Sequence, residues 1–352
     1  MKSIKVCFIA VILAGALAAA STLSAAASLL EQTQSQQKPK ESKEKKEAED
    51  PQEQEADQTI RLGTQLVTVP FNVTDKKNKY INELTKDEIE VLEDDKPQKI
   101  FSFERQTDLP LTIALLIDIS GSQSYTLPAE KSAAQRFLRR VIRPAKDIAA
   151  VATFEGEAEL VQNFTSDVEK LSRAIDSVQV PVMPPSVHTG GTPPINGGSR
   201  VGSTALHDAI YAVSSDLLKN EAGRRVLILI SDGVNYGSRL KLRDAIERTW
   251  RNEVIVYCVG IGDPSYDGVD EGTLKKVASE TGGRAFFPRN EEDLDKAFAL
   301  IDEDLRSQYV LAYEPLNEAR DGSFRTIQMK VKNRKDLTVR HRRGYFAPKE
   351  TE

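Results

Sequence analysis

The sequence predicts an α/β fold, doubly wound, with a mostly parallel six-stranded sheet, helices on both faces and a small β module formed from the flanking segments. In the middle of the chain, uninterrupted apolar runs alternate with helically spaced apolar residues. Period-two patterns occur before and after this central part. A length of 352 residues, with 39% hydrophobic and 29% charged residues, is typical of a globular protein of about two domains.

The first residues have the pattern of an export signal. Lys2 and Lys5 precede the apolar run Val6–Ala20, and small residues follow at Ala25–Ala27. These are the three parts of a cleaved secretory leader, so we predict a signal peptide over residues 1–27 and a periplasmic or extracellular protein. An uncleaved anchor is the alternative, because the apolar run could extend through the alanines.

Residues 28–58 are predicted to be a disordered, charged linker. Between Glu31 and Gln58, half of the 28 residues are charged, with five Lys against nine Asp or Glu, and there are no aromatic or large aliphatic side chains. Such a segment buries too little apolar surface to offset the entropy lost on ordering.

Residues 59–108 are predicted to form the small β module. Apolar and polar residues alternate over Val67–Val73, as in a half-buried strand, and Pro70 indicates a sheet edge because proline cannot donate to a strand ladder. Ile89–Val91 and Ile100–Phe103 are predicted as further strands, separated by a turn at Asp94–Pro97.

Residues 109–305 alternate between strand and helix patterns. Strands are predicted at Leu111–Ile117, Ile148–Phe154, Ala158–Val161, Val226–Ile230, Val254–Val259 and Ala285–Phe287. Helices are predicted at about Ala134–Ile142, Leu206–Leu217, Leu240–Trp250, Leu274–Glu280 and Leu294–Leu305. This alternation indicates an open, mostly parallel sheet with helices on both faces.

Residues 306–352 are predicted to be a carboxyl-terminal β extension. Its strands are predicted at Tyr309–Tyr313, Ile327–Val331 and Leu337–Arg340. We expect these strands to complete the amino-terminal β module, which would place both flanking segments beside the central domain.

Five oxygen-bearing side chains follow or precede the predicted central elements. Asp118, Ser120 and Ser122 come directly after a buried strand, where ligands bind in open α/β sheets. Thr204 precedes a helix, and Asp232 follows another buried strand. Because Mg²⁺ prefers about six oxygen ligands, we predict that these side chains converge on one divalent cation, Mg²⁺ or Mn²⁺.

Each of these residues has a simpler interpretation when it is taken singly. Thr204 could cap a helix, Asp232 could belong to a turn, and Ser120–Ser122 could be a flexible loop. Their occurrence together at three strand or helix ends favours the metal site.

Three segments carry a resemblance to a known family. They read DISGS at 118–122, GSTALHDAI at 202–210 and ISDG at 230–233, and they resemble the metal-ion-dependent adhesion site (MIDAS) of the von Willebrand factor A domain. The resemblance covers Leu111–Asp302 and implies a Rossmann-like fold. The flanking segments LTKDEIEVLEDDKPQKIFSFE, LRSQYVLAYEP and RRGYFAP are similar to a bacterial family of exported VWFA-related domain proteins.

The resemblance also implies roles for the five residues. Ser120, Ser122 and Thr204 would coordinate the metal directly, and Asp118 and Asp232 would act largely through bound water or as orienting ligands. A cation held in this way keeps positive character and an open position, which an Asp or Glu of a partner protein can fill.

The loop Val180–Val201 is predicted to lie at the rim of this site. It is rich in Pro and Gly, shows no periodicity and precedes Thr204. We expect it to shape the choice of partner, with simple disorder as the alternative.

The sequence therefore predicts an exported, metal-dependent interaction module of the adhesion type and not an enzyme. A formal charge of -5 without a basic stripe excludes nucleic acid, and no small-molecule substrate is indicated. One alternative is an envelope scaffold with an unused or structural metal. Another is a metal-assisted hydrolase with Asp118 or His207 as the base. Gly260 and Gly262 are no nucleotide fingerprint, because the pattern breaks at Asp263–Tyr266.

Overall fold

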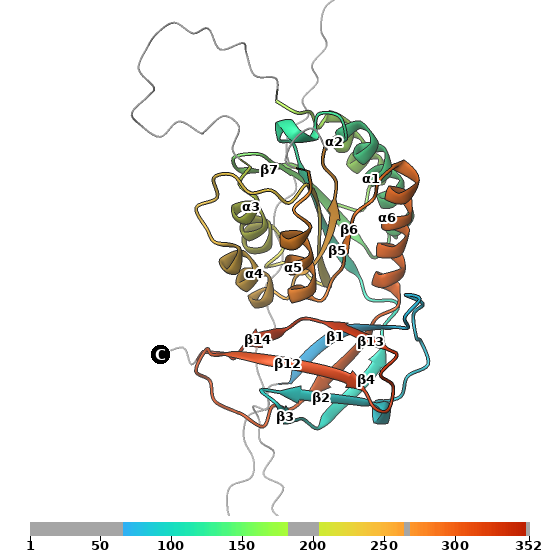
Figure 1. Ribbon diagram of the computed structural model, residues 1–352, viewed down its shortest axis with the longest axis vertical. Helices are drawn as coiled ribbons and strands as arrows, with labels where there is room; N and C mark the ends of the chain where they lie inside the picture. The colour runs from blue at the N-terminus through green and yellow to red at the C-terminus, as the bar shows by residue number, and fades with distance from the viewer. Residues whose placement is uncertain (1–65, 182–203, 264–267, 350–352) are drawn as a thin grey trace, which may run out of the picture. The chain divides into compact units, whose positions relative to one another are not determined.

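The computed structural model describes residues 66–181, 204–263 and 268–349, which Figure 1 draws in colour. The predicted signal peptide, the linker and nearly all of the predicted rim loop lie outside the described residues. Within the described ranges, no helix combines the length and the apolar character needed to cross a bilayer.

The central sheet has six strands in the order β10-β9-β8-β5-β6-β7. They are β5 (Leu111–Asp118), β6 (Ile148–Phe154), β7 (Ala158–Thr165), β8 (Arg224–Ser231), β9 (Ile255–Gly260) and β10 (Ala285–Phe286). All neighbouring pairs are parallel except β6 with β7. The predicted six-stranded, mostly parallel sheet is therefore confirmed.

Helices cover both faces of this sheet (Figure 1). One face carries α1 (Leu127–Val141), α2 (Val168–Ser177) and α6 (Glu291–Arg306). The other carries α3 (Leu206–Ala212), its π-helical continuation η3 (Val213–Leu217), α4 (Leu242–Arg251) and α5 (Glu271–Thr281). Along β5, Ile113 and Leu115 pack in the first layer and Ala114 and Leu116 in the second, since successive side chains point to opposite faces. Burial on both faces is why the inner strands β5, β6, β8 and β9 are mostly apolar, whereas the edge strand β7 is largely exposed and carries several polar residues.

The flanking segments form two antiparallel sheets with a shared core, in the orders β13-β1-β11-β4 and β14-β12-β2-β3. Their strands are β1 (Val67–Thr74), β2 (Ile89–Glu93), β3 (Lys96–Pro97), β4 (Ile100–Arg105), β11 (Tyr309–Tyr313), β12 (Phe324–Val331), β13 (Thr338–His341) and β14 (Gly344–Phe346). Short 3₁₀ turns are η1 (Lys86–Glu88) and η2 (Gly121–Gln123). Each sheet combines strands from before and after the central domain, as predicted.

The prediction that Pro70 marks an edge strand is wrong. β1 lies between β13 and β11 in its sheet. Pro70 is tolerated there because β13 pairs only from Phe71 onward, so at Pro70 the strand has β11 alone as its paired neighbour.

The predicted turn over Asp94–Pro97 is also too long. Lys96 and Pro97 form β3 and pair with β2, which leaves Asp94 and Asp95 as the turn. Both aspartates have positive φ, 47° and 64°, as a two-residue hairpin of the primed type requires. Other elements differ from prediction at their ends, notably α1, which begins at Leu127, and β7, which continues to Thr165.

Polar contacts join the β module to the central domain. Asn72 of β1 donates from Nδ2 to the Asp304 carboxylate at 2.6 Å and to its carbonyl oxygen at 2.9 Å. Tyr80 donates to the same carboxylate at 2.5 Å. Because Asp304 lies in the last turns of α6, the module is bonded directly to a helix of the central domain.

Candidate metal site at the carboxyl edge of the central sheet

The candidate site lies where β5 and β8 end side by side. These strands are parallel neighbours, and Ile117 pairs with Ile230 one residue before the polar segments begin. The chain passes from β5 to β6 on one side of β5 and later enters β8 on the other side. The site therefore occupies the switch point of the sheet, where an open crevice forms beyond the strand ends.

Hydrogen bonds connect four of the five predicted residues in one network. Asp118 accepts from the Ser120 backbone N at 2.9 Å and from Ser231 Oγ at 2.7 Å. Ser122 Oγ donates to Asp232 Oδ2 at 2.6 Å, and the hydroxyls of Ser120 and Ser122 lie 3.1 Å apart. The two carboxylates and two hydroxyls, from separate strand ends, thus converge at one edge.

Thr204 reaches the same edge through its backbone. Its carbonyl oxygen accepts from Tyr236 N at 2.8 Å, in the segment that follows Asp232. The next residue, Ala205, donates to Glu155 O at 2.6 Å, just beyond the end of β6. Ala205, not Thr204, is the N-cap of α3, so helix capping does not account for Thr204.

Asp232 also takes part in a turn. One of its carboxylate oxygens bonds within the turn, and the other bonds to Ser122. Its Oδ1 accepts from Val234 N at 2.9 Å, and Gly233 has a φ of 79°. Its Oδ2 accepts from Ser122 and faces the site. The simpler interpretation of Asp232 as a turn residue is therefore correct but incomplete.

The sequence prediction missed two side chains that support this network. Gln123, fully buried, donates from Nε2 to Asp232 Oδ2 at 3.1 Å and to Ile261 O at 3.3 Å. Ser231 bonds to Asp118 as described above. Ser231 could have been found, because it is a polar residue at the end of an apolar strand. Gln123 could not, because nothing in its polar loop indicates that it is buried.

Glu130 of α1 is a further buried acid near the site. Neither of its carboxylate oxygens has a well-formed hydrogen bond among the described residues. The Thr126 hydroxyl donates to Gln123 but lies close enough to Glu130 to lower its pKa in part. Burial, and then the charges of Asp118 and Asp232, raise the pKa of Glu130 to about 8. The Glu130 carboxyl is therefore mostly protonated at neutral pH, and a nearby cation would favour its charged form.

Burial also raises the pKa of Asp118 to about 6. Hydrogen bonds from Ser120 and Ser231 oppose this shift, and the charge of Asp232 adds to it. A cation would favour the charged form of both carboxylates.

The donor set fits a hard divalent cation. Carboxylate and hydroxyl oxygens are the ligand types that Mg²⁺ and Mn²⁺ take. Within the described ranges, no group of three or more His, Cys, Asp or Glu side chains is arranged to hold a metal. Hydroxyls would therefore have to supply part of the coordination shell.

Two sequence models of the von Willebrand factor type A domain match, one at residues 113–235 and one at residues 195–300. A comparison with curated proteins gives no match.

Several solved structures are similar to the chain. The conserved hypothetical protein BatB from Bacteroides thetaiotaomicron is 18% identical, with 55% of this chain and 99% of that chain covered and a TM-score of 0.42. A von Willebrand factor type A protein from Catenulispora acidiphila is 14% identical, with 83% and 76% covered and a TM-score of 0.46. Proximal thread matrix protein 1 from the mussel byssus, solved with a zinc-occupied MIDAS motif, is 19% identical, with 59% and 49% covered and a TM-score of 0.46.

Proposed function

The chain contains a von Willebrand factor type A domain, and from this premise we propose that the protein is an interaction module that binds a partner protein through a divalent cation. The cation would be Mg²⁺ or Mn²⁺. Its ligands would be five oxygen-bearing side chains, Asp118, Ser120, Ser122, Thr204 and Asp232.

The observation that carries this proposal is the bond from Ser122 to Asp232. It joins the loop after β5 to the loop after β8, so donors 110 positions apart already share one oxygen cluster.

The composition of the cluster supports binding of an outside carboxylate. Three of its five members are neutral hydroxyls. A divalent ion coordinated directly by these hydroxyls, with Asp118 and Asp232 acting largely through bound water, would keep positive character. Such an ion supplies a Lewis-acid centre for an Asp or Glu of the partner. The leader sequence supports export, so we propose a partner in the periplasm or outside the cell.

The geometry gives little support to a hydrolase. His207 Nδ1 lies 3.1 Å from the Leu240 carbonyl oxygen, and its backbone N donates to Ser238 Oγ at 3.0 Å. Asp118 is buried, and both of its carboxylate oxygens are hydrogen bonded within the fold. Both candidate bases thus take part in hydrogen bonds of the fold, and we favour the interaction module over the hydrolase.

Metal binding is tested by melting the purified full chain in EDTA and then in excess MgCl₂ or MnCl₂. A ligand bound only to the native state raises stability, by about 2.7 kcal/mol at 100 times its Kd. We expect Ser122→Ala to lose this rise. Ser124→Ala is the matched control, because Ser124 Oγ bonds to Gly121 O in the same turn.

Partner binding is tested by capture from envelope extracts with immobilised chain, in Mn²⁺ and in EDTA. We expect a captured protein that is lost in EDTA and with Ser122→Ala but retained with Ser124→Ala. An unchanged melting temperature in both metals contradicts the site. A metal-dependent rise without metal-dependent capture contradicts the interaction module and favours a scaffold with a structural metal.

A further inference from the structure

A second cavity lies at the opposite edge of the central sheet, against the β module. Its volume is about 280 Å³, and it is bordered by the first residues of β8 and β9, the end of α4, and β1 and β11 of the module. Much of its wall is apolar and consists of Pro70, Leu109, Trp250, Val254, Ile255 and Val310. Small-molecule sites occur preferentially at such junctions between domains, with volumes of roughly 300–1,000 Å³.

Positive charge is concentrated on the same wall. Three arginines, Arg224, Arg225 and Arg342, line the cavity together with one acidic residue, Glu253. Arg342 forms an ion pair with the carboxylate of that residue, with Nη1 at 3.0 Å from Glu253 Oε1. The cavity therefore has an excess of positive charge.

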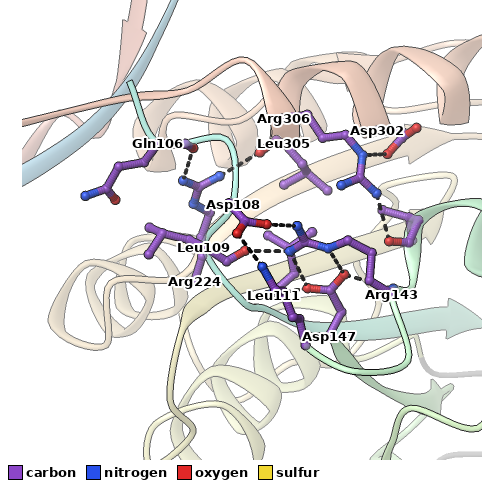
Figure 2. A network of polar contacts seen from close by, with 12 residues as sticks. Gln106, Asp108, Leu109, Leu111, Arg143, Asp147, Arg224, Asp302, Leu305 and Arg306 are labelled. Carbon is purple, nitrogen blue, oxygen red and sulfur yellow. Dashed lines mark hydrogen bonds and ion pairs between the residues drawn. The ribbon is translucent and has the colours of Figure 1, made fainter. Parts of the chain in front are cut away.

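Arg224 and Arg225 are bonded to neutral carbonyl groups. Arg224, which is only 8% exposed, donates to Leu305 O at 2.7 Å and to Gln106 O at 3.4 Å (Figure 2). Arg225 donates to Glu221 O at 3.1 Å and to Asn252 O at 2.6 Å. Burial lowers the pKa of Arg224 to about 10, so the group still carries its charge at neutral pH.

Arg342 is held in place on the same wall. It is 8% exposed, and its Nη2 donates to Thr68 O at 2.9 Å. Its Nε is buried and has no hydrogen-bond partner among the described residues. Two of its three guanidinium nitrogens are therefore bonded within the fold, and the group stays beside the cavity as a fixed positive charge.

We propose that this cavity binds a small amphiphilic anion, a carboxylate with an aliphatic or aromatic tail. The tail would pack on the apolar wall with Trp250 and Val310, and the carboxylate would accept charge-assisted hydrogen bonds from the guanidinium groups. The volume suits a single-chain ligand and is too small for a whole phospholipid. This proposal is independent of the metal site.

Trp250 provides a direct readout, because it is the single tryptophan of the sequence and lines the cavity. The full chain is titrated with decanoate below its aggregation concentration while tryptophan emission is followed. Decanol serves as the uncharged analogue and butyrate as the short-tailed one. We expect saturable quenching or shift with decanoate and at least tenfold weaker binding of both analogues.

Two variants test the location. Val310→Phe should fill the cavity and weaken decanoate binding at least tenfold, whereas Val161→Phe, at an exposed position of β7, should leave it unchanged. Arg225→Gln removes one charge without breaking an ion pair and should weaken decanoate binding more than decanol binding. Arg173→Gln, on the exposed surface of α2, is its control.

Three results would overturn the proposal. These are a tryptophan signal that does not saturate with decanoate, decanol affinity within threefold of decanoate affinity, and unchanged decanoate affinity in a folded Val310→Phe chain. A folded Arg225→Gln chain that binds both ligands like the wild type would reject recognition of the anionic group.

Discussion

Arg143 and Asp147 form a bidentate ion pair beneath the central sheet (Figure 2). Nε donates to Oδ2 at 2.7 Å and Nη2 donates to Oδ1 at 2.8 Å. The backbone N of Leu111, the first residue of β5, also donates to Asp147 at 2.9 Å. Burial alone would raise the pKa of Asp147, but these hydrogen bonds outweigh burial and hold it below its usual range.

Asp147→Asn should therefore destabilise the fold by about 3 kcal/mol at pH 7, because it leaves Arg143 without its carboxylate and Leu111 N with a weaker acceptor. The folded-state pKa is depressed, so the wild-type stabilisation is present above the unfolded pKa of about 3.9 and is lost as pH falls through the folded value. Urea unfolding from pH 7 to pH 2.5 should show the two chains converging at acid pH. Asp216 is exposed, so Asp216→Asn should change the free energy of unfolding by less than about 0.5 kcal/mol. An equally small effect of Asp147→Asn at pH 7 would contradict a stabilising role of the Arg143–Asp147 pair.

The contribution of Glu130 to stability should be lost as the pH rises, whereas that of Asp147 is lost as the pH falls. Glu130→Gln tests this. Because the folded pKa of Glu130 is raised to about 8, its contribution is fully present below the unfolded pKa and is lost as pH rises through the folded value. In EDTA, the variant should gain on the wild type by roughly 2 kcal/mol between pH 5 and pH 8. Glu157→Gln, with an exposed side chain, should show no such trend. If the free energies of unfolding of Glu130→Gln and the wild type depend on pH in the same way, the pKa of Glu130 is not raised in the folded protein.

Gln123→Ala should weaken Mn²⁺ binding by roughly 10- to 100-fold while the fold stays intact. Its amide is bonded to Asp232, and residues that orient a metal ligand typically have effects of this size. Calorimetric titration measures the affinity, and exposed Gln179→Ala is the control. If Gln123→Ala binds Mn²⁺ like the wild type, Gln123 does not position Asp232 for the ion.

Gly283→Ala should destabilise the chain by more than about 2 kcal/mol, because the added Cβ would overlap the Val256 carbonyl oxygen of β9. Gly121→Ala meets no atom within 4 Å and should cost less than about 0.5 kcal/mol. Thermal or urea unfolding compares the two. Equal effects would mean that β9 and the α5–β10 connection can separate at little cost.

The central sheet was predictable because its inner strands are buried on both faces: Thr112 is the one polar residue in Leu111–Ile117, and Val226–Ile230 has none. Whether Pro70 belongs to an edge strand or to an inner strand could not be predicted, because it depends on how far β13 extends along β1. The turn at Asp94 and Asp95 depends on a backbone conformation that the local pattern only partly indicates.

The candidate site also has residues that could be predicted from the sequence and residues that could not. Asp118, Ser120, Ser122 and Asp232 lie in short segments at strand ends, so topology alone brings them together. Gln123, in η2, and Glu130, in the first turn of α1, are polar residues that become buried only in the folded structure, so their place beside the site could not be predicted from the local sequence. The metal-coordinating role of the five residues remains a prediction. The cavity beside Trp250 was not predicted at all, because β1, α4 and β11 each supply only part of its wall.

The strands of the β module are separated by the whole central domain, and Asn72 and Asp304 lie 232 positions apart. As the chain emerges amino terminus first, from the ribosome or from the export machinery, β1 and β2 appear long before β11 and β12. Until then β1 has no strand to pair with, and β2 has only β3. Contacts of such high sequence separation form slowly, and unpaired strands invite aggregation. We therefore expect the central domain to fold first and the module to close last, with α6 bringing β11 to β1. Synthesis halted before β11 would leave an open sheet edge that a holding chaperone must shield.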